Sequence, residues 1–199
     1  MLKKGIILAG GKATRLYPTT KVITKQLLPI YDKPMIFYAL TTLMQLKIRD
    51  IAIIVSPDQK INFEKILGNG NQWGINLFYI IQKYPEGIAQ AYILAEDFIG
   101  QSSSALILGD NIFYGNDLNF VNQYKSNNSF KSKIFLYRVS DPNRYGLAKF
   151  KNKKLEKIYE KPKKIYSNFA VTGLYFFDNQ AAKYAKTLKK SLRGELEIS

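Results

Sequence analysis

The 199-residue chain contains neither cysteine nor histidine. Without cysteine there can be no disulfide, no thiolate nucleophile and no thiolate metal site. Without histidine, Ser-His-Asp and Cys-His catalysis and histidine-ligated zinc are excluded as well. Any catalysis by this chain must therefore use carboxylates, lysine, arginine, hydroxyl groups or the backbone.

Long apolar runs are also missing. The apolar segment near the start of the chain ends at Gly10-Gly11, which makes it too short for a signal-peptide core or a membrane-spanning helix. No later stretch is long enough to span a bilayer. The sequence therefore predicts a cytoplasmic protein with no membrane partner.

Acidic residues are few, with 15 Asp and Glu against 30 Lys and Arg, so the formal net charge is +15. Strong basicity is compatible with a polyanion such as nucleic acid. Most of the basic residues are scattered lysines, however, and clusters such as Lys161-Pro162-Lys163-Lys164 are short. We therefore favour solvated lysines and an anionic small substrate over nucleic-acid binding.

A hydrophobic fraction of 46% over this length predicts one domain with a buried core. Short apolar runs alternate with helical patterns, which predicts βαβ units and a parallel sheet covered on both faces. After about residue 132, strands follow one another closely and predict an antiparallel or mixed extension of the sheet. The expected strands are 5–9, 51–55, 77–81, 105–108, 134–137, 146–150, 154–158 and 171–177, and the expected helices are 34–46, 88–98 and 179–188.

A glycine pair, Gly10-Gly11, directly follows the first strand, where α/β sheets bind ligands. Glycines let the backbone approach a phosphate, although this loop matches neither the P-loop nor the dinucleotide fingerprint. Arg15 and Lys25 follow in the same connection and could bind phosphate oxygens. These residues alone leave open a simple turn followed by two exposed cations.

Further polar residues stand at other strand ends. Asp110 follows the strand 105–108 and could hold Mg²⁺ together with substrate phosphates, or could simply cap a turn. Glu160-Lys161 could face the same cleft or form an exposed charge pair, and Gln82 could bond a base edge or end its strand. Together these residues favour phosphoryl or nucleotidyl transfer, in which positioning and charge neutralisation provide most of the catalysis.

Motifs along the whole chain closely resemble those of the glucose-1-phosphate thymidylyltransferases, a family of sugar nucleotidyltransferases, and they follow the family order. The matching segments are Gly10-Gly11-x-Ala13-Thr14-Arg15-Leu16-Tyr17-Pro18, residues 25–36, Gln72-Trp73-Gly74, residues 87–91, residues 108–115, Arg144-Tyr145-Gly146, Glu160-Lys161-Pro162, residues 168–175 and residues 193–198.

This resemblance implies a Mg²⁺-dependent reaction of dTTP with glucose 1-phosphate. The products would be dTDP-glucose and pyrophosphate, in the first step toward dTDP-rhamnose and related cell-surface sugars. The implied fold is a Rossmann-like, mixed and mainly parallel sheet flanked by helices, as in nucleotide-diphospho-sugar transferases. Within one catalytic domain, residues 1–131 would form the nucleotide-binding core and residues 132–199 the sugar-binding part. Full-length relatives would be homo-oligomers.

The resemblance also assigns roles residue by residue. Arg15 and Lys25 would neutralise the triphosphate and the leaving pyrophosphate, and Lys161 would bind the sugar phosphate or the α-phosphate. Asp110 would hold Mg²⁺, and Gln82 and Gly87 would read the thymine. The implied nucleotide-binding residues are Leu8, Ala9, Gly10, Gly11, Thr14, Arg15, Lys25, Gln26, Gln82, Pro85, Gly87 and Asp110. The implied sugar-binding residues are Asn111, Tyr145, Gly146, Glu160, Lys161 and Val171.

Two positions depart from the family pattern. Ala13 stands where the family usually has glycine, and if φ is positive there, alanine costs on the order of 1 kcal/mol. Because alanine occurs there in the wider superfamily, activity should survive. Thr24 replaces a serine and keeps the hydroxyl group.

A third departure is length, because relatives continue past the position of Ser199 through an Asp and for roughly another third of their chain. A fold incomplete at its C-terminus would lack a second metal-binding Asp. It would turn over poorly and would expose apolar surface where that segment packs. Two other readings stay open: a transferase using another nucleotide such as UTP, and a non-catalytic remnant that binds nucleotide.

Overall fold

The computed structural model describes residues 2–11, 13–115, 132–191 and 194–198. One of the matching motifs includes Arg193, which lies outside this part of the chain, and the expected boundary at 131/132 borders the undescribed segment 116–131. Among the described residues, every helix is too short or too polar to span a bilayer.

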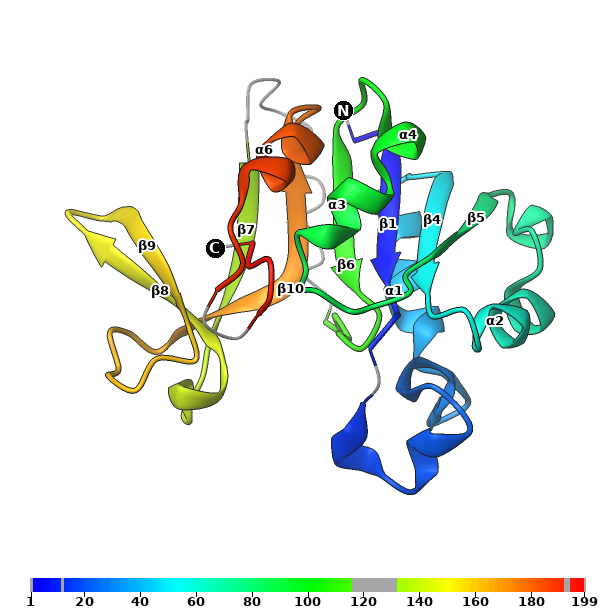
Figure 1. Ribbon diagram of the computed structural model, residues 1–199, viewed down its shortest axis with the longest axis horizontal. Coiled ribbons are helices and arrows are strands. Elements are labelled where there is room, and N and C mark those ends of the chain that lie inside the picture. Colours follow the sequence, from blue (N-terminus) through cyan, green and yellow to red (C-terminus); the bar gives the residue numbers. More distant parts are fainter. Residues whose placement is uncertain (1, 12, 116–131, 192–193, 199) are drawn as a thin grey trace.

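Four parallel strands form one side of the sheet, in the order β5 (Asn76–Ile81), β4 (Asp50–Val55), β1 (Lys4–Leu8) and β6 (Ser104–Leu108), with β5 at the edge. The first strand of the sequence therefore lies in the middle (Figure 1). The continuous apolar runs predicted these strands because both sheet faces are covered, and the residues 51–55 are fully buried.

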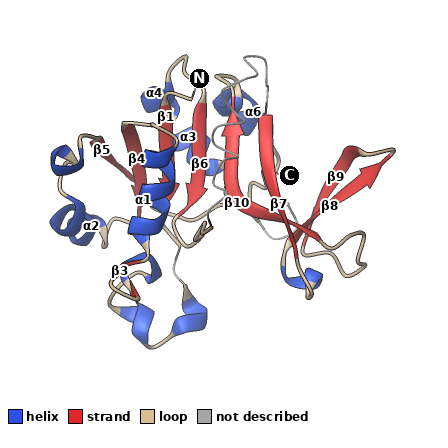
Figure 2. Ribbon diagram, turned by 180° about the vertical axis from the view of Figure 1, so that it is seen from behind, coloured by secondary structure: helices blue, strands red, loops and turns tan. Residues whose placement is uncertain are grey.

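Helices cover the two faces. α1 (Ile36–Gln45) lies on one face, and α3 (Gln90–Leu94) and α4 (Glu96–Ile99) lie on the other (Figures 1 and 2). The single helix expected over 88–98 is wrong in one respect, because the backbone at Ala95 (φ −95°, ψ 11°) divides it. Apolar side chains keep helical spacing across this break, so the pattern could not reveal it.

The second half of the chain extends the sheet with antiparallel strands, as predicted. β10 (Phe169–Phe177) pairs antiparallel with β6 on one side and with β7 (Ser132–Arg138) on the other. The hairpin β8 (Gly146–Lys151) and β9 (Lys154–Glu160) pairs with β10 in register at Ala170 and Leu147 and projects from the sheet (Figure 1). α6 (Ala181–Thr187) shares an apolar cluster with α3.

Several short elements were not predicted. The connection from β1 to α1 contains three 3₁₀ turns, η1 (Thr14–Leu16), η2 (Thr19–Lys21) and η3 (Lys25–Leu27), and a small hairpin of β2 (Pro29–Ile30) and β3 (Lys33–Pro34). Pro34 therefore ends a strand and does not open the helix. α2 (Lys60–Leu67) escaped prediction because it buries only Phe63 and Leu67. Two more 3₁₀ turns are η4 (Asn71–Trp73) and η6 (Pro142–Arg144).

Candidate functional site

The carboxyl ends of the parallel strands meet at one edge of the sheet. The first residues after them continue the hydrogen-bond ladder, with Ala9 N–H donating to Ile54 O at 2.8 Å and Gly109 N–H donating to Leu8 O at 2.9 Å. Gln82 N–H likewise donates to Val55 O at 2.8 Å. The loops that leave this edge therefore start side by side.

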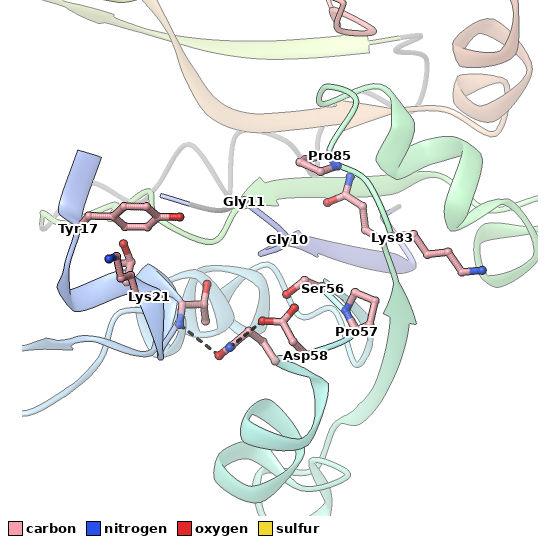
Figure 3. Close-up of a pocket in the computed structure, with 13 residues that line it drawn as sticks. Gly10, Gly11, Tyr17, Lys21, Ser56, Pro57, Asp58, Lys83 and Pro85 are labelled. Atoms are coloured by element: carbon pink, nitrogen blue, oxygen red, sulfur yellow. Dashed lines mark hydrogen bonds between the residues drawn. The ribbon is translucent and has the colours of Figure 1, made fainter. Parts of the chain in front are cut away.

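An open pocket of about 280 Å³ lies at this edge (Figure 3). Four of the predicted nucleotide-binding residues line it, which are Gly10, Gly11, Gln82 and Pro85. The other lining residues were not predicted, and they are Tyr17, Thr20, Lys21, Thr24, Ser56, Pro57, Asp58, Gln59 and Lys83. The charged residues of the lining are Lys21, Asp58 and Lys83, and the Lys83 side chain runs away from the pocket (Figure 3).

A simple rule could have found part of this missed set. Ser56 and Pro57 directly follow β4, just as Gly10 and Gln82 follow closely on β1 and β5. The principle that ligands bind at the carboxyl ends of parallel strands therefore applies to them equally. Tyr17 and Lys21 come from the unpredicted turns, and their sequence carried no comparable signal.

Gly10 is required by close packing. A Cβ atom on Gly10 would lie 2.1 Å from Oε1 of Gln82, whereas a Cβ atom on Gly11 would meet no atom within 4 Å. The first glycine therefore makes room for the Gln82 side chain, and the second leaves the backbone open to the pocket.

Lys25 and Asp110 form an ion pair beside this pocket. The other carboxylate oxygen of Asp110 accepts a hydrogen bond from Asn111 Nδ2 at 3.1 Å, and Asn111 Oδ1 accepts one from Gly173 N–H at 2.9 Å. The Asp110 carboxylate thus forms an ion pair with one side chain and a hydrogen bond with another. These contacts favour a charged binding site over a carboxylate that only caps a turn. They also connect the end of β6 to β10.

Asp110 does not belong to a protein cage for a metal within the part of the chain that the structure describes. Across the described residues there is no group of three or more His, Cys, Asp or Glu side chains that could hold an ion. Mg²⁺ often takes one or two carboxylates and completes its shell with substrate phosphates and water. Asp110 therefore fits a metal that is shared with a phosphate ligand.

Gln26 lies buried beneath the Asp110 loop. Its Oε1 accepts a hydrogen bond from the Thr24 hydroxyl group at 2.6 Å, and its Cγ lies close to Gly109. The hydroxyl group that Thr24 shares with serine therefore has a structural partner. Thr24 also lines the pocket and directly precedes Lys25, which pairs with Asp110.

Most of the predicted sugar-binding residues border two adjoining hollows that share Val171. A small cavity of about 40 Å³ has Gly146, Glu160 and Val171 in its wall. A Cβ atom on Gly146 would lie 2.8 Å from Glu160 Oε2, so this carboxylate lies over the glycine. A larger pocket of about 390 Å³ is bordered by Asn111, Tyr145 and Val171 and by the exposed Tyr114 and Tyr137, among other residues.

The small cavity differs from the larger pocket in having a carboxylate, Glu160, and a buried phenol, Tyr175, in its wall. Tyr175 also borders it, and burial, with a smaller contribution from the Glu160 carboxylate, raises the pKa of the Tyr175 phenol. Lys161 follows Glu160 in a left-handed conformation (φ 42°), with its N–H donating to Tyr145 O at 3.1 Å and its ammonium 3.8 Å from the Glu160 carboxylate. The pair predicted from sequence is thus partly a mutual ion pair, with Glu160 also on the cavity.

Some predicted residues are not brought to the pocket. Thr14 and Arg15 lie exposed on η1 and do not line it. Arg15 takes part in no hydrogen bond or ion pair with the described residues. Gly87 (φ 107°) packs against the backbone of Leu196, since a Cβ atom there would lie 2.5 Å from Leu196 O. Ala9, which directly follows β1, is buried.

Ala13 has a left-handed backbone (φ 47°, ψ 42°), so φ is positive at the position where the sequence predicted strain for alanine in that case. Its carbonyl group accepts hydrogen bonds from the Thr20 hydroxyl at 2.8 Å and from Leu16 N–H at 3.0 Å. The surrounding turn therefore holds Ala13 in a conformation that favours glycine.

Comparison with known proteins now adds to this geometry. Residues 4–199 match the model of the nucleotidyl transferase family. A glucose-1-phosphate thymidylyltransferase of Xanthomonas campestris pv. campestris (strain B100) is 52% identical over 198 residues, which cover 99% of this chain and 67% of that protein. The chain thus spans about two thirds of the length of this relative.

Two solved structures have the same fold. One is a Bacillus anthracis protein described as a glucose-1-phosphate thymidylyltransferase, crystallised with sucrose. It superposes with a TM-score of 0.90 at 44% identity, covering 98% of this chain and 79% of that one. The other is a UDP-glucose pyrophosphorylase bound to UDP-glucose, with a TM-score of 0.85 at 25% identity over 100% of this chain and 84% of that one.

Proposed function

We propose, from the premise that this chain belongs to the nucleotidyl transferase family, that it joins dTTP and glucose 1-phosphate to form dTDP-glucose and pyrophosphate. The observation that carries this proposal is the ion pair of Lys25 and Asp110. Through Thr24 this pair adjoins the pocket beside Gly10, and through Asn111 it adjoins the pocket beside Val171. Two substrates bound in these hollows would both approach the same pair of charges.

The reaction needs no protein nucleophile. An oxygen of the glucose 1-phosphate would attack the α-phosphorus of dTTP and form a new phosphorus–oxygen bond. The bond from the α-phosphorus to the bridging oxygen breaks, and pyrophosphate leaves with the electron pair. Catalysis then consists of positioning and charge neutralisation, which suits a chain without cysteine and histidine.

On the nucleotide side, the backbone at Gly10 and Gly11 would approach the phosphates, and the Lys25 ammonium would neutralise them. Gln82 and Gly87 would contact the thymine. Arg15 stays a candidate for the leaving pyrophosphate, although binding would have to draw its exposed side chain toward the pocket. The remaining proposed nucleotide contacts are Leu8, Ala9, Thr14, Gln26, Pro85 and Asp110.

On the sugar side, the Glu160 carboxylate is suited to accept hydrogen bonds from sugar hydroxyl groups. Lys161, which adjoins it, would bind a phosphate. Asn111, Tyr145, Gly146 and Val171 would complete this site. The proposed division places nucleotide binding in residues 1–131 and sugar binding in 132–199, but Asn111 and Ile88 of the first part also border the sugar pockets.

Asp110 would hold Mg²⁺ together with the phosphates of the nucleotide. Such an ion neutralises charge that develops on the phosphates during transfer. Lys25 must then give up the Asp110 carboxylate and turn to the phosphates, which are the stronger anion once the nucleotide is bound.

The test is release of pyrophosphate from dTTP and glucose 1-phosphate, measured with UTP, dCTP and GTP as competing nucleotides. The proposal expects dTTP to be preferred, and Asp110→Ala and Lys25→Met to lower kcat/KM by about 10²-fold or more, as expected for groups that stabilise a charged transition state. A preference for UTP would instead assign the activity of the more distant uridylyl enzymes.

A non-catalytic nucleotide-binding protein is the third outcome. Calorimetric titration with dTTP, in the presence and absence of Mg²⁺, would then show binding without any pyrophosphate release. The link to dTDP-rhamnose synthesis and the homo-oligomers expected of full-length relatives stay predictions from the resemblance, and the cytoplasmic location stays a prediction from the lack of long apolar runs. Whether this chain also forms homo-oligomers is open, and light scattering on the purified chain tests it.

A further inference from the structure

Gln82 is buried at the pocket edge, and the described residues satisfy only one of the two ends of its side-chain amide. Only 3% of the residue is exposed. Its Nε2 donates a hydrogen bond to Gln90 Oε1 at 2.6 Å. The Oε1 atom lies over Gly10 on the pocket wall, and no donor among the described residues meets it.

The orientation of the Gln82 amide follows from groups whose polarity is certain. Glu86 N–H can only donate, and it donates to Gln90 Oε1 at 3.0 Å. The Glu86 carboxylate accepts the other end of the same amide, from Gln90 Nε2 at 3.0 Å. Gln90 must therefore present its oxygen to Gln82, and Gln82 must present its Nε2 in return.

Two contacts from the end of the described chain hold Glu86 itself. Its second carboxylate oxygen pairs with the Lys190 ammonium, and its carbonyl oxygen accepts the Leu196 N–H at 2.6 Å. Glu86 can therefore neither turn its carboxylate away nor leave its position without breaking these bonds. A continuous series of polar contacts, one ion pair and two hydrogen bonds, therefore runs from Lys190 through Glu86 and Gln90 to Gln82.

We propose that Gln90 is a positioning residue that fixes the Gln82 amide with its oxygen toward the pocket. The pocket then accepts a nucleotide base that presents a ring N–H at that point. This inference rests on the proposed function and goes beyond it. Thymine and uracil carry such a donor at N3, whereas N3 of cytosine is an acceptor and would face the Gln82 oxygen without a hydrogen bond.

The Gln82 oxygen should make the binding free energy differ between bases. It accepts a hydrogen bond from the N3–H group of thymine or uracil but meets an acceptor at N3 of cytosine. An acceptor that a bound base covers without donating to it loses its hydration and gains no hydrogen bond. This costs more free energy than one hydrogen bond contributes. The wild-type chain should therefore bind dTTP and dUTP at least about tenfold more tightly than dCTP, which corresponds to roughly 1.4 kcal/mol.

Two variants separate orientation from packing. Gln90→Leu removes the partner of Gln82 Nε2, so the amide can turn and offer that NH₂ group to cytosine N3. The ratio of the dCTP to the dTTP dissociation constant should then fall at least about threefold. Gln90→Glu alone would set a second carboxylate against that of Glu86, so it is combined with Glu86→Gln. This exchange variant keeps an acceptor for Gln82 Nε2 and for the backbone N–H of position 86, and its new amide can donate to its new carboxylate, so it should retain the wild-type ratio.

The experiment is calorimetric titration of the wild-type chain and both variants with dTTP, dUTP and dCTP, with melting temperatures measured in parallel. A lower ratio in Gln90→Leu and an unchanged ratio in the exchange variant support the inference. An unchanged ratio in Gln90→Leu overturns it while dTTP binding by the wild type leaves the proposed function intact. If Gln90→Leu does not fold, the exchange variant decides alone: a retained ratio supports the inference and a lowered ratio overturns it. Wild-type binding without preference for dTTP over dCTP would also overturn it, and absence of any nucleotide binding would overturn the proposed function as well.

Discussion

The Lys25 ammonium forms an ion pair with the Asp110 carboxylate, although 85 positions separate the two residues in the sequence. In the protein without nucleotide, the proposed metal ligand thus already has a cation. The two side chains are 27% and 31% exposed, so ligands can reach them. A divalent cation that approaches Asp110 must compete with an ammonium group that is attached to the protein.

We expect Lys25→Met to strengthen binding of Mn²⁺ to the nucleotide-free chain by several-fold, because the competing charge is removed. The broadening of the backbone NMR signals of residues 109–111 during Mn²⁺ titration measures this binding at the relevant site. Lys65→Met, which removes one positive charge from the end of α2, is the matched control and should leave the midpoint unchanged. Equal midpoints for Lys25→Met and the wild type would contradict the competition.

Gly10→Ala should destabilise the free protein by about 1–3 kcal/mol, because the new methyl group would overlap Gln82 Oε1 and force that side chain out of place. Gly11→Ala introduces the same methyl group with no atom within 4 Å and should change the free energy of unfolding by less than about 0.5 kcal/mol. Urea denaturation without nucleotide measures both. A similar loss in the two variants would show that the space around Gly10 is not the cause.

Ala13→Gly should raise the free energy of unfolding by about 1 kcal/mol, because the left-handed backbone at this position is strained for every residue with a Cβ atom. The matched control is Ala182→Gly, in the regular part of α6, where glycine should cost about 1 kcal/mol. Denaturation curves should therefore move in opposite directions for the same chemical change. A loss of stability in both variants would show that Ala13 is not strained.

Acid should weaken the row of side chains that crosses three parallel strands. Asp50 lies between Asn76 and Lys4, whose side chains donate hydrogen bonds to it at 2.8 and 3.0 Å. The Asn76 hydrogen bond first, and then Lys4, hold the pKa of Asp50 below its usual value of 3.8. The resulting stabilisation is present above pH 3.8 and is lost as the pH falls through the lowered pKa of the folded protein.

Asp50→Asn should therefore lose less unfolding free energy than the wild type as the pH falls below 3.8, since it has no carboxyl group to protonate there. Denaturation at a series of pH values from neutral to acid measures the difference. Asp97→Asn removes a carboxylate that lies outside this row and serves as the control. Parallel pH profiles for wild type and Asp50→Asn would show that the row contributes nothing.

The sequence predicted the strands well because both faces of the sheet are covered and the runs 51–55 and 105–108 are continuously apolar. It also predicted that Gly10 and Asp110 would face one crevice, since parallel strands end at one edge; the structure brings Gly10 and Gln82 into one pocket, whereas Asp110 does not line it. The division of the helix at Ala95 and the turns between Thr14 and Leu27 could not be predicted, because tertiary contacts and not local periodicity determine them.

The hydrogen-bond partners of the site residues were also beyond the sequence. Nothing in the motif around Gln82 indicated that Gln90 would take its Nε2, or that Lys190 would reach Glu86 across 104 positions. Arg15 shows the reverse case, because the motif placed it at the phosphates, whereas the structure leaves it exposed on η1. A motif specifies which residues take part, while side-chain packing decides where each one lies before a ligand binds.

The central position of β1 has a consequence for synthesis of the chain. β1 precedes both of its neighbours, β4 and β6, in the chain, and Lys4 has its second partner only at Ser104. Until that residue has emerged from the ribosome, an apolar strand has an edge without its partner, the condition under which nascent chains aggregate or recruit chaperones. Completion of the ligand-binding edge therefore depends on how fast translation proceeds from β1 to β6.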